Sequence, residues 1–223
     1  MALISDQDSV RRPLTKVDWI EAAIEVMVDS SVEQVRVESL ARELDVSKGS
    51  FYWHFKNRDD LLEAVLERWR HDTTSGVQER LKRREPSAAN RLLLFLRLPL
   101  RSARAVRSAD LELAILGWAR RSRMAEMAVA EVDRLRIAHV SGLLEEMGFS
   151  PADAELRAHI AYAFIRYISQ RRDLDAKVRF DMTTVVHSLL ANRDKDASAA
   201  LVVAVGTMAA DQPRTVPSGD SPD

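Results

Sequence analysis

Cysteine is absent from the 223 residues of this chain, and glycine and proline occur only 7 times each. The absence of cysteine excludes disulfide frameworks, zinc–cysteine sites, iron–sulfur clusters and thiol nucleophiles. Aromatic residues make up only 6% of the chain, whereas Leu, Ala, Arg and Glu, which favour helices, are abundant. The composition therefore predicts an all-α protein.

Long apolar runs and an excess of one charge are lacking as well. The two longest apolar runs, residues 92–100 and 199–210, are shorter than the roughly 20 residues that span a bilayer, and the N-terminus does not resemble a signal peptide. We therefore expect a soluble, cytoplasmic protein with no membrane partner. Because 33 basic residues are balanced by 34 acidic ones, any attraction for nucleic acid must come from a local patch.

The sequence contains no recognisable catalytic or metal-binding pattern. Its five histidines form neither a His-Glu-x-x-His motif nor a Glu-x-x-His pair. A glycine-rich phosphate loop and a Gly-x-Ser-x-Gly elbow are also missing. We therefore predict no catalytic residue, no metal site and no cofactor, and a helical-bundle enzyme is the weaker alternative.

Apolar spacing and capping residues predict about nine helices. The first runs from a cap at Thr15 or Asp18 to Val28, and the second is a short helix that begins at Val37. The others are expected at 48–54, 57–85, 87–105, 109–121, 124–147, 150–170 and 175–191, with a kink or an end of the helix at Pro99.

Residues 37–55 are the most informative segment, because two short helices meet there at a tight turn. Phe51 and Phe55 occupy the core positions i and i+4 of the second helix, so Tyr52 and Trp53 point away from that core. The alternative is that Tyr52 and Trp53 are ordinary core aromatics. The spacing favours an exposed aromatic face.

Basic and hydrogen-bonding groups share this exposed face, and no acidic residue lies between Ser47 and Arg58. A charged face that only contacts solvent is the alternative interpretation. Cations, hydroxyls and aromatic donors on one short helix are nevertheless suited to contact phosphates and to reach base edges in a major groove. The predicted recognition face comprises Ser47, Lys48, Gly49, Ser50, Tyr52, Trp53, His54, Lys56 and Arg58.

The run LARELDVSKGSFYWHFKNRDDLLEAVL at residues 40–66 resembles the N-terminal region of the TetR family of transcriptional regulators, and the strong resemblance covers residues 15–70. The resemblance implies phosphate contacts by Thr15, Tyr52, His54 and Lys56. It implies that Lys48, Gly49, Ser50 and Trp53 face the major groove. Asp45 departs from the glycine that is common in such turns, but aspartate tolerates a left-handed backbone better than most residues.

The resemblance also implies the domain organisation and the partners. Residues 1–56 are expected to form a helix-turn-helix DNA-binding domain and residues 57–192 a helical-bundle domain for ligand binding and dimerisation, followed by a tail at 193–223. The expected function is that of a repressor that binds a palindromic double-stranded operator as a homodimer and is released by an unknown small-molecule effector. A DNA-binding protein without an effector is the alternative.

Two further sets of residues are predicted in the larger domain. The family pairs its last two helices as a four-helix bundle, which implies a dimer interface here. Adaptable apolar residues are candidates for lining a ligand cavity, although an ordinary core is the alternative. The interface set is Ile160, Phe164, Tyr167, Val185, Val186 and Leu189, and the cavity set is Phe95, Trp118, Met124 and Met127.

Overall fold

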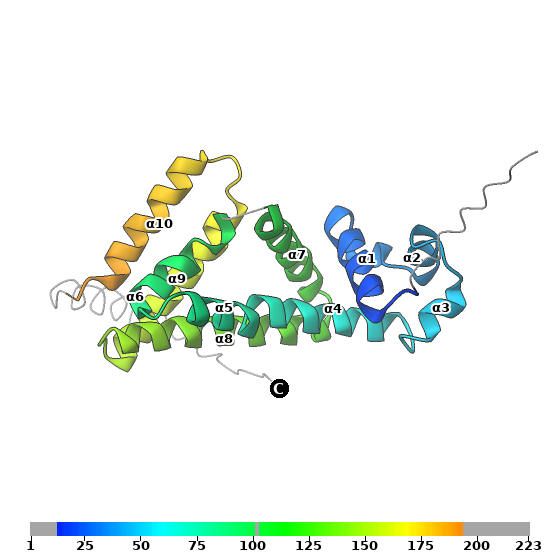
Figure 1. The fold of residues 1–223 in the computed structure, drawn as a ribbon, viewed down its shortest axis with the longest axis horizontal. Coiled ribbons are helices and arrows are strands. Elements are labelled where there is room, and N and C mark those ends of the chain that lie inside the picture. The colour runs from blue at the N-terminus through cyan, green and yellow to red at the C-terminus, as the bar shows by residue number, and fades with distance from the viewer. Residues whose placement is uncertain (1–12, 101–102, 194–223) are drawn as a thin grey trace, which may run out of the picture.

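A computed structural model describes residues 13–100 and 103–193, which contain ten α-helices, two short 3-10 helices and no strand (Figure 1). The predicted all-α class is therefore confirmed. Within these ranges, no helix combines the length and the apolar character needed to cross a membrane. The helices are α1 Lys16–Asp29, η1 Val32–Gln34, α2 Val37–Glu43, α3 Lys48–Tyr52, α4 Arg58–Thr73, α5 Ser75–Arg84, α6 Ala88–Leu96, η2 Leu98–Leu100, α7 Ala103–Ala119, α8 Arg123–Glu146, α9 Pro151–Gln170 and α10 Ala176–Ala191.

Helix starts follow the capping residues of the sequence. Thr15 caps α1 in a capping box, in which its side chain accepts from the backbone N–H of Asp18 and the Asp18 carboxylate accepts from the backbone N–H of Thr15. Asn57 accepts from the N–H of Asp60 at 2.9 Å and caps α4. Ser150 accepts from the N–H of Asp153 at the start of α9. These caps satisfy amides that have no partner within the helix, and they fix where each helix begins.

The first hydrophobic core joins the N-terminal helices to the middle of the chain. Trp19 of α1 and Phe51 of α3 are fully buried in it. The same core contains Ile115 and Trp118 of α7 and Val132 of α8. Figure 1 shows α4 running from the small N-terminal helices towards the centre of the molecule, with α8 beside it. The N-terminal helices therefore pack directly on α7 through α1, and α4 connects them to α8.

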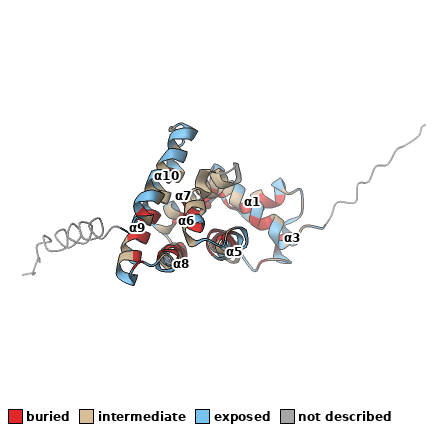
Figure 2. Cartoon of the chain, turned by 60° about the vertical axis from the view of Figure 1, so that its left-hand side comes forward, coloured by how far each residue is buried: buried red, intermediate tan, exposed pale blue. Residues whose placement is uncertain are grey.

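The second hydrophobic core lies at the other end of the molecule. It is built from α5, α6, the C-terminal half of α8, α9 and one residue of α10, with Leu92, Leu96 and Leu144 fully buried. In Figure 2, α10 is mostly exposed, whereas buried residues are frequent on α8 and α9. Only Thr183 and Leu190 of α10 are buried. Most of the surface of α10 is therefore uncovered in the single chain.

The prediction of one helix over residues 57–85 is wrong. The chain divides at Thr74, which has φ −122° and ψ −96°, so that α4 ends at Thr73 and α5 begins at Ser75. The hydroxyl of Thr73 donates to the carbonyl of Trp69 at 2.7 Å, and that of Thr74 donates to the carbonyl of Arg70 at 2.6 Å. Such side-chain bonds to the preceding turn compete with the helical backbone pattern and bend or end a helix.

Two other predicted boundaries also differ from the structure. The predicted break between residues 105 and 109 is wrong, because α7 runs without interruption from Ala103 to Ala119. The predicted kink or end at Pro99 is confirmed as an end, because α6 stops at Leu96 and Pro99 lies in η2. Proline has no N–H for a helical hydrogen bond, which explains the stop at this point. The helix predicted at residues 48–54 is also shorter than expected, since α3 ends at Tyr52.

Candidate nucleic-acid interface

The turn between α2 and α3 is tight and closed by backbone hydrogen bonds. The N–H of Leu44 donates to Leu40 at 2.9 Å, and the N–H of Val46 donates to Ala41 at 2.9 Å. Asp45 lies between them with φ 54°, the only positive φ of a residue other than glycine in the described ranges. The predicted left-handed backbone at Asp45 is therefore confirmed. This geometry fixes the angle at which α3 leaves α2.

The buried side of α3 locks the helix to the N-terminal core. Phe51 is 0% exposed and Phe55 is 2% exposed. Phe51 meets Trp19 edge to face, with ring centroids 5.3 Å apart, and stacks on Phe55 at 5.4 Å. Aromatic pairs in these arrangements add to the free energy gained from burial. The orientation of α3 is therefore set by two aromatic residues that flank its outward face.

The outward side of α3 leaves two large aromatic side chains in solvent. Tyr52 is 61% exposed and Trp53 is 88% exposed. Lys48, Gly49 and Lys56 are exposed as well. Tyr52 makes an edge-to-face contact with Phe51 at 5.3 Å, but most of the apolar area of Tyr52 and Trp53 stays in water, so burial does not account for two such large side chains here. The aromatic and basic groups predicted for the recognition face thus share one exposed surface of the described chain.

The Ser47 hydroxyl does not act as the predicted helix cap. Ser47 has the extended backbone of an N-cap residue, but its side chain accepts no hydrogen bond from α3. The first turn is closed instead by the N–H of Ser50, which donates to the carbonyl of Ser47 at 3.0 Å. The Ser47 side chain is exposed and not held by the cap, so it is available for an external partner.

Lys48 lies on the exposed face but is paired within the chain. Its ammonium group donates to the carboxylate of Glu38 on α2 at 2.9 Å, and both side chains are more than half exposed. The hydrogen bond from Lys48 holds the pKa of Glu38 below its usual value. An exposed ion pair of this kind contributes little to stability. A phosphate that approaches Lys48 can therefore replace Glu38 at small cost.

Arg58 has a structural role that differs from the prediction. Its guanidinium donates to the backbone carbonyl groups of Val32 and Val35, which lie just before α2. Arg58 thereby ties the start of α4 to the segment that leads into α2 through Nε and Nη2, and its Nη1 lies 3.8 Å from the carboxylate of Asp59. The prediction that Arg58 belongs to the DNA-facing surface is wrong for this reason. Lys56 is exposed, and its backbone N–H donates to Asp60 at 2.9 Å.

The start of α1 adds a basic residue that the sequence analysis did not include. The Thr15 hydroxyl donates to the Asp18 carboxylate at 2.7 Å, so this predicted phosphate-contacting group is already held by the capping box. The next residue, Lys16, is exposed and places its ammonium 5.0 Å from the centre of the Phe55 ring. Lys16 therefore lies close to the end of α3. Only the packing of α1 on α3 could have revealed this neighbour.

Ser50 and His54 lie on one edge of the exposed face, where they line a shallow groove. The groove encloses about 470 Å³ and is bounded on its other side by the segment before α1 and by the turn after α2. Both residues are half-buried. The groove is lined by Pro13, Leu14, Leu44, Val46, Ser50, Trp53 and His54.

The four residues predicted to line a ligand cavity are not brought together. Phe95 is buried in the second core, where its ring lies 5.5 Å from that of His139. Trp118 is buried in the first core, and Met124 packs against the same core. Met127 is 58% exposed on α8. The four were predicted as adaptable apolar residues, and the sequence could not tell which core each would join or that Met127 would join neither.

The residues predicted for a dimer interface lie on α9 and α10. Val185 and Leu189 are 58% and 68% exposed, although both are large and apolar. Phe164 and Val186 are partly buried and pack against the second core. Ile160 and Tyr167 of α9 are 43% and 45% exposed. The two helices therefore present several apolar side chains to solvent in the single chain.

Comparison with known sequences places the N-terminal region in a family. The family model described as "Bacterial regulatory proteins, tetR family" matches residues 20–65. The chain is 36% identical over 59 residues to the uncharacterized helix-turn-helix transcriptional regulator YwcC of Bacillus subtilis. The aligned segment makes up 26% of this chain and 26% of that protein. It is 38% identical over 52 residues to the regulator SrpR of Pseudomonas putida, covering 23% of this chain and 24% of that protein. The matched segment thus spans about a quarter of these relatives.

Solved structures resemble the chain over a much greater length. A transcriptional regulator from a Rhodococcus species aligns with a TM-score of 0.66 and 18% identity, over 79% of this chain and 96% of that one. The regulator FadR of Bacillus subtilis, solved in complex with stearoyl-CoA, aligns with a TM-score of 0.59 and 18% identity, over 80% of this chain and 98% of that one. At this identity the likeness shows a shared fold, which extends through the larger helical domain.

Proposed function

We propose that this chain, whose residues 20–65 match the model of the tetR family of bacterial regulatory proteins, regulates transcription by binding a palindromic operator as a homodimer. The observation that carries the proposal is the division of α3 into two faces. Phe51 and Phe55 are buried, whereas Tyr52 and Trp53, which lie between them, are exposed together with Lys56. In this proposal α3 enters the major groove, and Tyr52 and Lys56 contact phosphates at its edge.

A second copy of the chain is required by the small size of the reading surface. The recognition helix α3 spans only five residues, Lys48–Tyr52, and so reaches few base pairs. Two copies held about 34–36 Å apart meet successive major-groove faces of the duplex and double the sequence that is read. The exposed apolar residues of α9 and α10 support these helices as the dimer interface, since pairing would remove Val185 and Leu189 from water.

We further propose that the protein is a repressor that a small molecule releases from DNA in the cytoplasm. The C-terminal end of α4 contacts α8 through a hydrogen bond and an ion pair. These contacts support the proposal that a ligand bound in the larger domain changes the position of α4. Arg136 of α8 donates to the carbonyl of Thr73 at 3.4 Å, and Arg70 of α4 is paired with Glu131 of α8. A ligand that binds one arrangement of α8 more tightly than another would therefore also bias α4 and α3. The stearoyl-CoA bound to the structural neighbour FadR supports a ligand response of this kind.

A DNA-binding protein without an effector is the second candidate. Phe95 and Trp118 are 4% and 8% exposed in two separate cores, and this close packing favours it. A thermal-shift screen with small metabolites separates the two candidates, because only the first predicts a ligand that raises the melting temperature and lowers DNA affinity.

A mobility-shift assay on the DNA upstream of the protein's own gene tests the proposal. We expect a shifted band that saturates as one dimer per site and that is lost for Trp53→Ala with the thermal stability unchanged. Leu113→Ala, which shortens an exposed apolar side chain on α7 outside the first core, serves as a control and should retain the band. Binding that is equally strong after Trp53→Ala and Tyr52→Ala would overturn the assignment of α3 as the recognition helix.

A further inference from the structure

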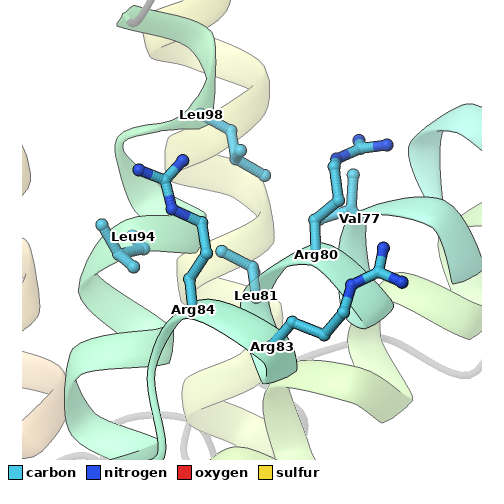
Figure 3. A pocket seen from close by; sticks show the side chains of 7 residues that line it. All are labelled: Val77, Arg80, Leu81, Arg83, Arg84, Leu94 and Leu98. Carbon is cyan, nitrogen blue, oxygen red and sulfur yellow. The ribbon is translucent and has the colours of Figure 1, made fainter.

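A groove with a basic rim lies between α5 and the α6–η2 segment, far along the chain from the recognition helix (Figure 3). It encloses about 200 Å³. The side of α5 supplies both apolar and charged residues, and α6 and η2 supply one leucine each. The groove is lined by Val77, Arg80, Leu81, Arg83, Arg84, Leu94 and Leu98.

The floor of the groove is apolar and firmly supported. Val77 and Leu81 are 7% and 4% exposed and belong to the second hydrophobic core. Leu94 and Leu98 pack against that core and are only partly covered. Figure 3 shows Leu81 at the base of the space and Leu98 on the opposite side of it. An apolar part of a ligand would therefore lie against a surface that does not need to rearrange.

The rim of the groove carries three guanidinium groups. Arg80 and Arg84 are one helical turn apart on α5, so their side chains rise on the same side of the helix as Leu81. In Figure 3, Arg80 and Arg84 rise from α5 on either side of Leu81, whereas Arg83 extends sideways from the helix. All three arginines are exposed. The positive charge is therefore held next to the apolar floor.

These guanidinium groups lack the carboxylate partners that neighbouring arginines have. In the described part of the chain, no carboxylate lies within ion-pair distance of Arg80, Arg83 or Arg84, and Arg80 donates only to the backbone carbonyl of Asp72 at 3.5 Å. On α4, by contrast, Arg68 is paired with Asp72 and Arg70 with Glu131. Basic residues at a helix C-terminus complement the helix dipole. The helix dipole does not explain why a cation without a carboxylate partner stands at Arg80, because Arg80 lies a full turn before the end of α5.

We infer that this groove binds a small amphiphilic anion, a short hydrocarbon chain or ring that carries one carboxylate or phosphate. Guanidinium groups bind both kinds of anion through paired hydrogen bonds, and Arg80 and Arg84 supply them from two sides. The space corresponds to about seven water-sized volumes at roughly 30 Å³ each, which suits a ligand body of about eight carbon atoms. The inference goes beyond the proposed function and does not depend on it, because binding is measured without DNA.

Isothermal titration calorimetry of the full chain with octanoate and with octyl phosphate tests the inference. We expect saturable binding of at least one of the two, and the stronger binder identifies the preferred head group. Octanol lacks the charge and inorganic phosphate lacks the chain, so both should bind much more weakly. Arg80→Gln and Arg84→Gln should each weaken binding about tenfold, since hydrogen bonds to charged groups are among the stronger ones.

Lys82→Gln is the matched control, because Lys82 carries the same charge on the same helix but does not line the groove. It should leave the affinity unchanged. Leu98→Gln keeps every arginine and should weaken binding by removing part of the apolar wall, and thermal melts verify that each variant is folded. The inference is overturned if neither ligand binds, if octanol binds as well as octanoate, or if Lys82→Gln has the same effect as Arg84→Gln.

Discussion

Arg136 of α8 binds the carboxylate of Glu112 of α7 with two parallel hydrogen bonds, Nη1 to Oε1 and Nη2 to Oε2, both at 2.8 Å. The side chains are only 10% and 17% exposed. Burial disfavours the charge of Arg136, but the nearby Glu112 outweighs this and raises the pKa of Arg136. The same guanidinium reaches the Tyr162 hydroxyl of α9 at 3.4 Å and the carbonyl of Thr73 at 3.4 Å. One buried cation therefore connects α4, α7, α8 and α9.

Arg136→Met should lower the free energy of unfolding by about 3 kcal/mol, because it removes both hydrogen bonds to the Glu112 carboxylate and leaves this mostly buried group only a 4.0 Å contact with Arg166. Urea denaturation monitored by circular dichroism measures the loss. The double variant Arg136→Met with Glu112→Met removes both charges and should recover much of the stability. A loss of less than about 1 kcal/mol in the single variant would show that the pair is solvated in solution.

Lys56→Ala should weaken operator binding and lower the slope of log affinity against log salt by about one, because one phosphate contact is lost. Fluorescence anisotropy with labelled operator at several salt concentrations measures the slope. Lys177→Ala is a suitable control, since Lys177 is paired with Asp181 on α10 and lies far from α3. Equal slopes for Lys56→Ala and the unaltered protein would exclude a phosphate contact at this position.

Gly49→Ala should leave the fold intact and reduce DNA affinity. A Cβ at Gly49 would meet only the Ser47 hydroxyl at an ordinary distance of 3.5 Å, and alanine favours a helix over glycine by up to about 1 kcal/mol. Gly142→Ala on α8 faces open space and gives the same helical gain without contact to DNA. Melting temperatures should not fall in either variant, while operator binding should weaken only for Gly49→Ala. Full binding by both would show that the backbone of α3 does not approach the duplex closely.

Stability should fall at high pH in a way that depends on Tyr162. Burial, reinforced by a hydrogen bond to Asp133, raises the pKa of Tyr162 from 10.0 to about 12. Because the folded state holds the phenol neutral, this contribution is complete below pH 10.0 and is lost as the pH rises towards about 12. Ultraviolet titration of the tyrosinate should show one late ionisation that disappears in Tyr162→Phe. If the titration of the folded protein is the same for both proteins, the phenol is not held neutral.

Leu189→Lys should convert the proposed dimer to monomers. The Leu189 side chain is 68% exposed on α10 in the single chain, and burial of an unpaired lysine in the proposed interface would be costly. Analytical ultracentrifugation gives the mass directly. Leu113→Lys changes another exposed leucine, on α7 and 42% exposed, and should remain dimeric. A stable dimer of the Leu189 variant would move the interface away from α10.

The face of α3 could be predicted from sequence because its period is local. The positions of Phe51 and Phe55 fix which side is buried, so the exposure of Tyr52 and Trp53 followed from spacing alone. The role of Arg58 could not be predicted in this way. Its partners are the carbonyl groups of Val32 and Val35, which lie more than 20 residues earlier in the chain. The tertiary contacts of a charged residue near a proposed recognition helix must therefore be known before a role in DNA binding can be assigned to it.

The larger domain was harder to predict, because its helices pack into two cores rather than one. The apolar stripes of Phe95 and Trp118 look alike in sequence, yet they belong to different clusters. The break at Thr74 was missed for a related reason. Threonine has only a weak effect on helix formation by itself, and the break depends on hydroxyl bonds to the carbonyl groups of Trp69 and Arg70.

The first hydrophobic core has a consequence for engineering. Because Trp19 and Phe51 share a core with Ile115 and Trp118 of α7, a fragment cut after residue 56 would lose its supporting wall. Arg107 of α7 adds ion pairs to Glu25 and Asp29 of α1 across the same boundary. A chimaera that joins this proposed DNA-binding module to the ligand-binding domain of another protein should therefore include α4 together with the inner surfaces of α7 and α8. A shorter graft should have a lower melting temperature and be cleaved more readily by proteases.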